Sequence, residues 1–241
     1  QPDDLNIYVN THDPANATKY YRWEYVETIQ YDAQNQSEIG VNNGLMYFRD
    51  ASNQIYHCWH INNSTDIFIG STTALTEDVV NEFPIIKIPQ NSEKVGIRYG
   101  ILVKQYAITQ QAYLYFQILK KNTEQQGSIF DVQPSQLRGN IHSVNDPNET
   151  VIGFVTASNV SQQRLFIRND ELTNWMRSNP QGICDAVTLQ TNPTNYLIYT
   201  YPDPAFVPWY FTCMGGCLIV TKKECVDCRE QGGTNIKPSY W

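Results

Sequence analysis

The chain is built around one alternating segment, Tyr20-Tyr-Arg-Trp-Glu-Tyr-Val-Glu-Thr-Ile-Gln-Tyr31. Side chains alternate between the two faces of a β-strand, so every second residue of this segment shares a face. One face is largely aromatic and apolar and carries Tyr21, Trp23, Tyr25, Glu27, Ile29 and Tyr31, whereas the other is polar and carries Arg22, Glu24, Thr28 and Gln30. The pattern predicts one long, half-buried strand.

The residues before this strand predict a second one. Leu5-Asn-Ile-Tyr-Val9 alternates in the same way, and His12-Asp-Pro-Ala-Asn16 consists of residues that favour a turn. We therefore expect the chain to open with a β-hairpin. Further strand-like segments follow at 54–60, 66–70, 85–88, 96–108, 151–156, 164–168, 196–201, 206–212 and 217–221.

One segment has the period of a helix. Thr109 suits its N-cap, and Gly127 suits its C-terminal end. Between them, apolar side chains recur every three or four residues, at Ala112, Tyr115, Phe116 and Leu119. We also expect a short helix over 170–176 and a turn of helix over 76–81.

These elements predict a mainly β fold, an antiparallel sheet or sandwich with one clear helix and one or two short helices packed on it. Strands and helices alternate too irregularly for a βαβ array. The sequence has no internal repeat and no linker, so we expect a single β-rich domain over residues 1–241. It also lacks an apolar run of the about 18 residues that a membrane-spanning helix needs.

The composition argues for an extracytoplasmic β protein. The formal net charge is -7, from 17 Lys and Arg against 24 Asp and Glu, which disfavours nucleic acid as a partner. Only 17% of the residues are charged, whereas soluble proteins average about 25%. Uncharged Asn and Gln, together with 16 Tyr, make up the difference and suit a hydrogen-bonding β surface.

The cysteines predict disulfides. The chain has six, an even number, namely Cys58, Cys184, Cys213, Cys217, Cys225 and Cys228. The last four could bind zinc, and the final pair has the C-x-x-C spacing of a redox motif. Because the composition indicates an oxidising compartment, we expect at least two disulfides, whose pairing the sequence leaves open. We expect the final pair to fasten the C-terminal tail, so that Trp241 is held against the body.

The sequence contains none of the common catalytic or nucleotide-binding motifs, so we expect no enzyme activity, no cofactor and no metal. His57 and His60 lie three apart on a predicted strand and point to opposite faces, which is wrong for ligands of one metal. Glu24 and Glu27 fail as a catalytic carboxylate pair for the same reason. We interpret these glutamates as solvated or ion-paired residues.

Aromatic residues are the stronger candidates for binding. Tyr and Trp are rigid and amphipathic, which suits protein interfaces and sugar stacking alike. They are dense near the C-terminus, and the residues that we select as candidate partner contacts are Trp209, Tyr210, Tyr240 and Trp241. Core packing is the alternative for each of these rings.

Several short sequence motifs, taken in their order along the chain, resemble those of one family. They are Tyr20-Tyr-Arg-Trp-Glu24 with Glu27-Thr28, Cys58-Trp59, Gly127-Ser-Ile-Phe-Asp-Val-Gln-Pro134, Gly139-Asn-Ile141, Val151-Ile-Gly-Phe154, Cys225-Val-Asp-Cys-Arg229, Gly232-Gly-Thr-Asn-Ile-Lys-Pro238 and Trp241. Over most of its length the chain is similar to the domain of unknown function 4249 family of Bacteroidota outer-membrane surface lipoproteins. The family has no established activity, so the resemblance supplies no catalytic residues.

The resemblance implies a location and a partner. Members of the family are exported with a lipid-modified N-terminal Cys, and their genes often neighbour TonB-dependent transporters. It therefore implies a non-enzymatic accessory subunit on the cell exterior, bound to a SusC-like outer-membrane β-barrel or within a larger transport or assembly complex. The alternative is a free-standing extracellular module that binds glycan or peptide.

Two departures from the family pattern affect this expectation. The chain lacks the usual N-terminal β region and lipobox, and Ser239-Tyr240 replaces the more usual Asp-Phe before Trp241. We expect the chain to be a fragment or a shortened relative, with any lipid anchor outside it.

Overall fold

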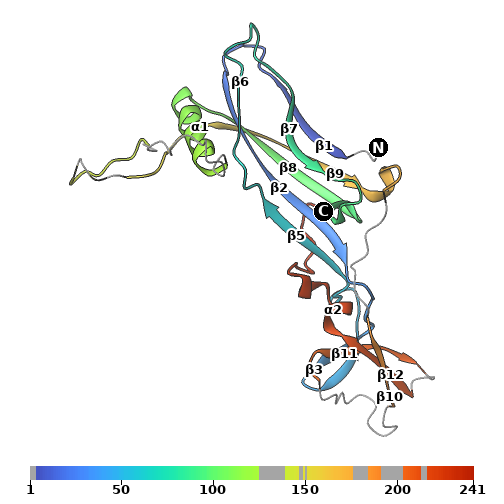
Figure 1. Cartoon of the computed structure of the whole chain (residues 1–241). Helices are drawn as coiled ribbons and strands as arrows, with labels where there is room; N and C mark the ends of the chain where they lie inside the picture. Colours follow the sequence, from blue (N-terminus) through green and yellow to red (C-terminus); the bar gives the residue numbers. More distant parts are fainter. Residues whose placement is uncertain are drawn as a thin grey trace, which may run out of the picture. The chain divides into compact units, whose positions relative to one another are not determined.

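The computed structural model describes residues 4–124, 139–146, 149, 151–175, 184–190, 203–212 and 216–241. Most of their regular structure is β, as predicted (Figure 1). The strands are β1 (Leu5–His12), β2 (Tyr20–Asp32), β3 (Ile39–Asn42), β4 (Leu45–Phe48), β5 (His57–Asn63), β6 (Phe68–Ser71), β7 (Val79–Ile88), β8 (Arg98–Ala107), β9 (Asn159–Arg168), β10 (Ala186–Gln190), β11 (Phe206–Thr212) and β12 (Cys217–Lys222).

The helices are α1 (Gln110–Glu124) and the single turn α2 (Lys223–Val226), with short 3₁₀ turns at Glu93–Val95, Asn169–Glu171 and Cys228–Gln231. The clear helix of the sequence is confirmed as α1. The N–H of Ala112 donates to Oγ1 of Thr109 over 3.2 Å, so Thr109 caps the helix as expected. Gly127 lies outside the described residues. Within the described ranges, no helix has both the length and the apolar character needed to cross a membrane.

The predicted long strand is confirmed as β2, which lies inside the largest sheet. The strand order of that sheet is β5, β2, β8, β9, and β6 pairs with the beginning of β2. The predicted opening hairpin is wrong, because β1 pairs antiparallel with β7 rather than with β2. The turn residues are held in another way. The carboxylate of Asp13 accepts hydrogen bonds from the N–H groups of Ala17 and Thr18, and the main-chain N–H of Asp13 donates to the carbonyl of Asp78, just before β7.

The chain divides into two compact units. Unit 1 consists of residues 1–26, 63–90 and 101–165, and unit 2 of residues 27–62, 91–100 and 166–241. Strands β2, β5, β8 and β9 therefore contribute residues to both units.

The core of unit 1 is built around Trp23, whose surface is fully buried. Its ring stacks on Phe83 with 4.2 Å between ring centroids, and on Tyr21 at 5.7 Å. A Cβ atom at Gly70 would lie 2.9 Å from the Trp23 ring, so this position of β6 requires glycine. The Tyr21 hydroxyl donates to the buried carboxylate of Asp78, and burial together with this bond raises the Tyr21 pKa above its ordinary value.

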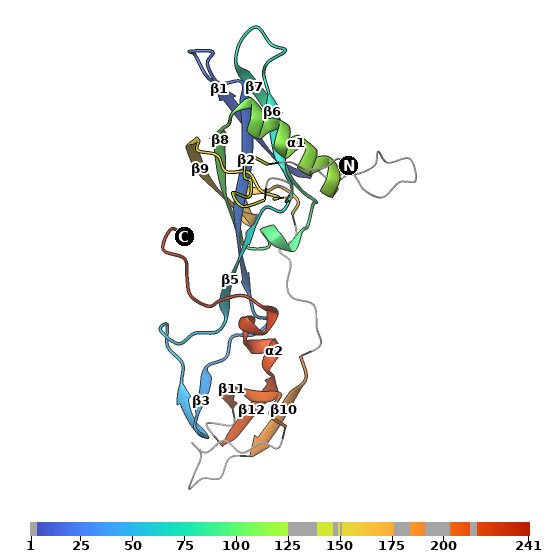
Figure 2. The ribbon, with the colours of Figure 1, turned by 90° about the vertical axis from the view of Figure 1, so that its left-hand side faces the viewer.

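Helix α1 lies against β6 in unit 1 (Figure 2). The Lys120 ammonium donates to the carbonyl of Ile67, just before β6. The Arg22 guanidinium lies over the ring of Phe116, 4.4 Å from its centroid. The helix therefore packs beside the sheet, as its amphipathic pattern predicts.

Unit 2 contains two small antiparallel sheets, β10-β12-β11 and β3-β4. Apolar side chains of both sheets form one buried cluster, consisting of Ile39, Met46, Leu218 and Val220. Strand β12 is buried from Leu218 to Thr221, as expected for the central strand of a three-stranded sheet.

Three sequence predictions of local structure are wrong. Residues 151–156 form no strand, because the side-chain amide of Asn140 donates to the carbonyl of Val155 and accepts its N–H, which occupies groups that a β ladder needs. Residues 79–81 are part of β7 rather than of a helix, since pairing with β1 outweighs the local pattern. Of the short helix expected over 170–176, the described residues form only the 3₁₀ turn Asn169–Glu171.

The sequence also missed β3, β4 and β10, which have four or five residues each. Alternation over so few residues is too short to recognise, and pairing with neighbouring strands decides these elements. The strand predicted at 196–201 lies outside the described residues.

Candidate functional site

The predicted contact residues Tyr240 and Trp241 lie at the end of the C-terminal tail of unit 2. The hydroxyl of Tyr240 is 2.9 Å from Oγ1 of Thr28, and Nε1 of Trp241 donates to the side-chain oxygen of Gln30 over 3.1 Å. Both partners lie on β2, so these aromatic side chains help to hold the tail. Contact with a partner protein stays a prediction for both residues.

A cation contributes to the packing of Trp241. The Arg98 guanidinium lies 4.8 Å from the Trp241 ring and 4.3 Å from the ring of Phe166, and the two rings meet edge to face. A Cβ atom at Gly100 would lie 2.8 Å from the Trp241 ring, so glycine leaves the room that this ring occupies. The expectation that the C-terminus is ordered and held in place is confirmed within unit 2.

Trp209 and Tyr210 lie on β11, where the register against β12 shifts between Pro208 and Tyr210. Trp209 is the extra residue of this bulge. Its Nε1 donates to the carbonyl of Gln36 over 3.0 Å, and its own carbonyl accepts the N–H of Glu38. The bulge turns Trp209 toward the segment before β3. Partner contact through these two rings is likewise untested.

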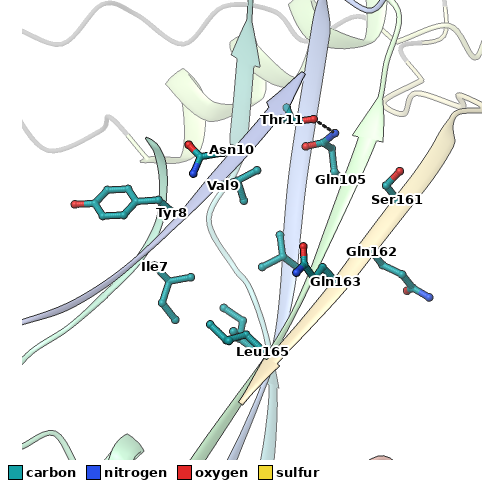
Figure 3. Close-up of a pocket in the computed structure, with 12 residues that line it drawn as sticks. Ile7, Tyr8, Val9, Asn10, Thr11, Gln105, Ser161, Gln162, Gln163 and Leu165 are labelled. Atoms are coloured by element: carbon teal, nitrogen blue, oxygen red, sulfur yellow. Dashed lines mark hydrogen bonds between the residues drawn. The ribbon is translucent and has the colours of Figure 1, made fainter. Parts of the chain in front are cut away.

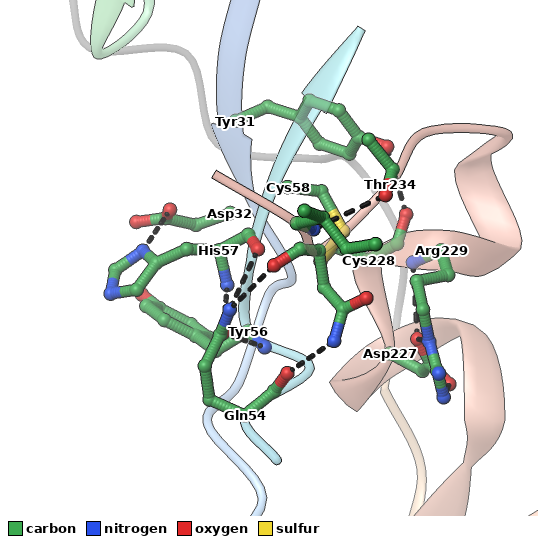
Figure 4. Close-up of a disulfide and its surroundings, with 12 residues drawn as sticks. Tyr31, Asp32, Gln54, Tyr56, His57, Cys58, Asp227, Cys228, Arg229 and Thr234 are labelled. Carbon is green, nitrogen blue, oxygen red and sulfur yellow. Dashed lines mark hydrogen bonds and ion pairs between the residues drawn. A yellow bond between two sulfur atoms is a disulfide. The ribbon is translucent and has the colours of Figure 1, made fainter. Parts of the chain in front are cut away.

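The prediction of at least two disulfides is confirmed. Cys58 pairs with Cys228 (Figure 4), and Cys184 pairs with Cys225. Cys217 is also disulfide-bonded, and Cys213 lies outside the described residues. Because Cys225 and Cys228 pair with distant cysteines, they form neither a zinc site nor a redox pair with each other.

The two bonds fasten the tail as expected. Asp227 lies beside the Cys58–Cys228 bond and accepts two hydrogen bonds from the Arg229 guanidinium, of 2.8 and 2.6 Å (Figure 4). Burial alone would raise the pKa of Asp227, but the bonds and charge of Arg229 outweigh it and lower the pKa.

The histidines and glutamates singled out in the sequence have separate partners. His57 bonds through Nδ1 to Asp32 at 2.6 Å (Figure 4), and His60 stacks on Tyr31. Glu27 is buried, where both of its carboxylate oxygens accept from the Lys94 ammonium at 2.9 Å. Glu24 pairs with Arg22, so both glutamates are ion-paired as interpreted from the sequence. In the part of the chain that the structure describes, no three His, Cys, Asp or Glu side chains converge on a metal position.

A cavity of about 820 Å³ lies beside this region of unit 2. Its lining mixes charges of both signs, including Arg49, Lys237, Glu38 and Asp50. The Arg49 guanidinium already donates to the carbonyls of Ile39 and Asn53. The cavity therefore has no single chemical character that would select a ligand.

A more coherent candidate is a groove of about 470 Å³ in unit 1, which we call the β1–β9 groove (Figure 3). Strand β1 forms one wall with residues 7–11, β8 forms the floor with Ile101, Val103 and Gln105, and β9 forms the other wall with residues 161–163 and Leu165. The floor uses every second residue of its strand, as expected for one face of a sheet. The walls use consecutive residues.

Consecutive residues mean that the wall strands expose backbone to the groove. Figure 3 shows the side chains of Tyr8 and Asn10 turned away from the groove, and that of Gln162 turned outward on β9. These residues line the groove mainly through their main chains. The groove thus lies between the edges of two strands.

The described residues that line the groove are all uncharged. Its polar members are hydroxyl and amide side chains, and its apolar members are aliphatic. Gln105 closes one end, since its Nε2 donates to Oγ1 of Thr11 over 3.0 Å while its Oε1 accepts Nε1 of Trp23 over 2.8 Å. Ile7 and Ile101 lie further along, and both are at least nine-tenths buried.

This groove could not be recognised from aromatic density or charged motifs. It consists of aliphatic, hydroxyl and amide residues on three strands that are far apart in the chain. The available signal was the uncharged run Ser161-Gln-Gln163, which lies on an exposed strand but offers no ion pair.

The comparisons with known proteins give one match. The family model described as "Domain of unknown function (DUF4249)" matches residues 1–164. Searches of curated proteins and of solved structures found no match. The match contains all of the groove except Leu165, whereas the cysteine-rich tail lies beyond it. Since the match covers 164 of the 241 residues, the chain belongs to the DUF4249 family.

Proposed function

We propose that the protein is a non-enzymatic accessory subunit on the exterior of the outer membrane. It binds a TonB-dependent transporter of the SusC type, or another subunit of a larger outer-membrane transport or assembly complex. The β1–β9 groove carries the proposal, because an open, uncharged groove between strand edges is suited to holding another molecule. The implication of the family resemblance agrees with this function.

The cysteines support the location. Disulfides persist in oxidising compartments and are rare in the cytosol. In unit 2 they link residues that are 170 and 41 positions apart, so they cross-link the unit itself rather than a short loop. An extracytoplasmic protein gains stability from such bonds, which fits a role on the cell surface.

Purification of the tagged native protein from membranes in mild detergent tests the proposal. We expect a β-barrel protein to co-elute in near-equal amount, identified by mass spectrometry. The same tag on an unrelated surface lipoprotein of the same cells is the control for nonspecific capture. Elution of the protein alone, also after mild chemical cross-linking in intact cells, would overturn the accessory-subunit proposal.

A second candidate function is favoured by the same groove. A free-standing extracellular module would bind glycan or peptide without any barrel. It predicts that the purified chain binds such a ligand with unchanged affinity whether or not a barrel is present. Ligand affinity that rises when the purified barrel is added would argue against this alternative.

A further inference from the structure

We propose that the β1–β9 groove binds an extended, uncharged polypeptide segment, which adds to the open edge of β9 and turns alternate apolar side chains into the groove. This inference deepens the proposed function, on which it rests for the role of the bound segment. It concerns the isolated chain and can therefore be tested without the transporter.

The first reason is the open edge of β9. This strand stands at the end of the order β5, β2, β8, β9, so among the described residues it pairs with β8 on one side only. Residues 159–163 are all exposed, including Val160 with half of its surface accessible. An edge strand that is exposed on both faces presents main-chain donors and acceptors to any chain that can pair with it.

The opposite wall of the groove is a poorer template. Within the described part of the chain, strand β1 also pairs on one side only, with β7, but its register shifts between Ile7 and Tyr8 and again between Val9 and Thr11. Such bulges twist an edge and interrupt its ladder. The added strand is therefore expected to pair with β9 and to use the β1 side chains as a wall.

The second reason is the shape and chemistry of the space. Val103 on the floor and Leu165 on the wall offer aliphatic surface to the inward side chains of an added strand. The lining has no charge, so a charged side chain in the groove would be buried without a partner. Hydroxyl and amide groups near Ser161 can bond to a polypeptide main chain.

The third reason is the size of the groove. A strand residue advances about 3.3 Å, with about 4.8 Å between strands and about 10 Å between stacked sheets, so each residue needs about 160 Å³. The groove of about 470 Å³ therefore accommodates about three residues of a strand in its interior. Flanking residues of the segment would continue along the edge of β9.

The test uses a synthetic pool of uncharged hexapeptides, acetylated and amidated, in which Val, Ile, Leu or Tyr alternates with Thr, Ser, Asn or Gln. The pool is passed over the immobilised full chain, and retained peptides are identified by mass spectrometry and resynthesised. We expect retained peptides whose affinity is lost when alternate main-chain nitrogens are methylated, because methylation removes the hydrogen bonds of strand pairing.

Two neighbouring residues provide matched variants. Figure 3 shows the side chain of Gln163 turned into the groove and that of Gln162 turned away from it. Both are exposed on the same strand, so either lysine substitution leaves folding intact, which near-ultraviolet circular dichroism checks. Gln163→Lys is expected to weaken peptide binding by about tenfold or more, because it places an unpaired charge beside the bound segment. Gln162→Lys is expected to change it less than about twofold.

Several outcomes would overturn the inference. The first is that the wild-type chain retains no peptide more strongly than the Gln163→Lys variant does. The second is that the two lysine variants weaken binding equally. The third is that peptides with methylated main-chain nitrogens still bind. Retention of neutral oligosaccharides by the groove in place of peptides would likewise replace the inference. Peptide binding by a chain that elutes from membranes alone would preserve the inference while refuting the accessory-subunit proposal, so the two failures are distinguishable.

Discussion

Removal of the Cys58–Cys228 disulfide is the most informative perturbation of stability. Both sulfur atoms are fully buried in a small cluster with Ala33, and the bond joins β5 to the turn after α2 within unit 2. The double variant Cys58→Ala/Cys228→Ala removes the cross-link and leaves no unpaired thiol behind. The matched control is Cys184→Ala/Cys225→Ala, which removes the other bond in the same way.

The expected magnitudes follow from the loops that the two bonds close. A disulfide limits the freedom of the unfolded chain, and in the chain-entropy model its effect grows with the logarithm of the loop length. In this model the Cys58–Cys228 bond, with a separation of 170 residues, stabilises the folded state by about 5 kcal/mol, and the Cys184–Cys225 bond, with a separation of 41, by about 4 kcal/mol. We therefore expect the first double variant to lose about 1 kcal/mol more than the second.

Urea unfolding of the oxidised proteins, followed by the fluorescence of the five tryptophans, measures these changes. Both variants should unfold at lower urea, with a steeper dependence on urea because their unfolded chains are less compact. A loss below about 1 kcal/mol for the first variant would refute the reasoning, because it would mean that the bond does not restrict the unfolded chain. A larger loss for the control would refute it as well.

Three further predictions concern single side chains. Trp241→Ala is expected to lower the free energy of unfolding by about 2 kcal/mol, which is less than the loss for a fully buried Trp. Urea unfolding measures this loss, and hydrogen exchange of the main chain around Gly100, which the Trp241 ring contacts, shows whether it is local. In the wild type, the ionised Asp227 stabilises the fold above about pH 4, and this contribution is lost as the pH falls through the lowered Asp227 pKa. Asp227→Asn should remove this contribution. The free energies of unfolding at pH 7 and pH 3 should therefore differ less in the variant than in the wild type. Equal pH dependence in both proteins would contradict the pairing with Arg229. Tyr21→Phe should cost about 1–2 kcal/mol because the buried carboxylate of Asp78 loses a donor, and thermal unfolding of the variant beside the wild type measures this loss.

The long alternating strand could be predicted because its pattern extends over many residues. β2 is correct almost to the residue, and α1 follows from its apolar period and its Thr109 cap. The disulfides followed from an even number of cysteines in an uncharged, amide-rich chain. In each case the property is local or compositional, so one segment or one count contains the information.

The pairing of strands could not be predicted in the same way. The first turn suggested a hairpin, but β1 pairs with β7, more than sixty positions further on. Residues 151–156 have the composition of a strand, yet the Asn140 amide occupies the main chain of Val155. The β1–β9 groove depends on such distant pairings, and for that reason its residues gave no recognisable signal.

The division of the chain has a consequence for inheritance and for engineering. The chain passes from one unit to the other after residues 26, 62, 90, 100 and 165, so each unit is assembled from three separate segments. Four of these junctions, after residues 26, 62, 100 and 165, fall inside strands β2, β5, β8 and β9. A single crossover between two genes therefore cannot exchange either unit intact, and a chimaera would need all five junctions to be matched. We expect the two units to be inherited together, as one gene segment that recombination does not subdivide.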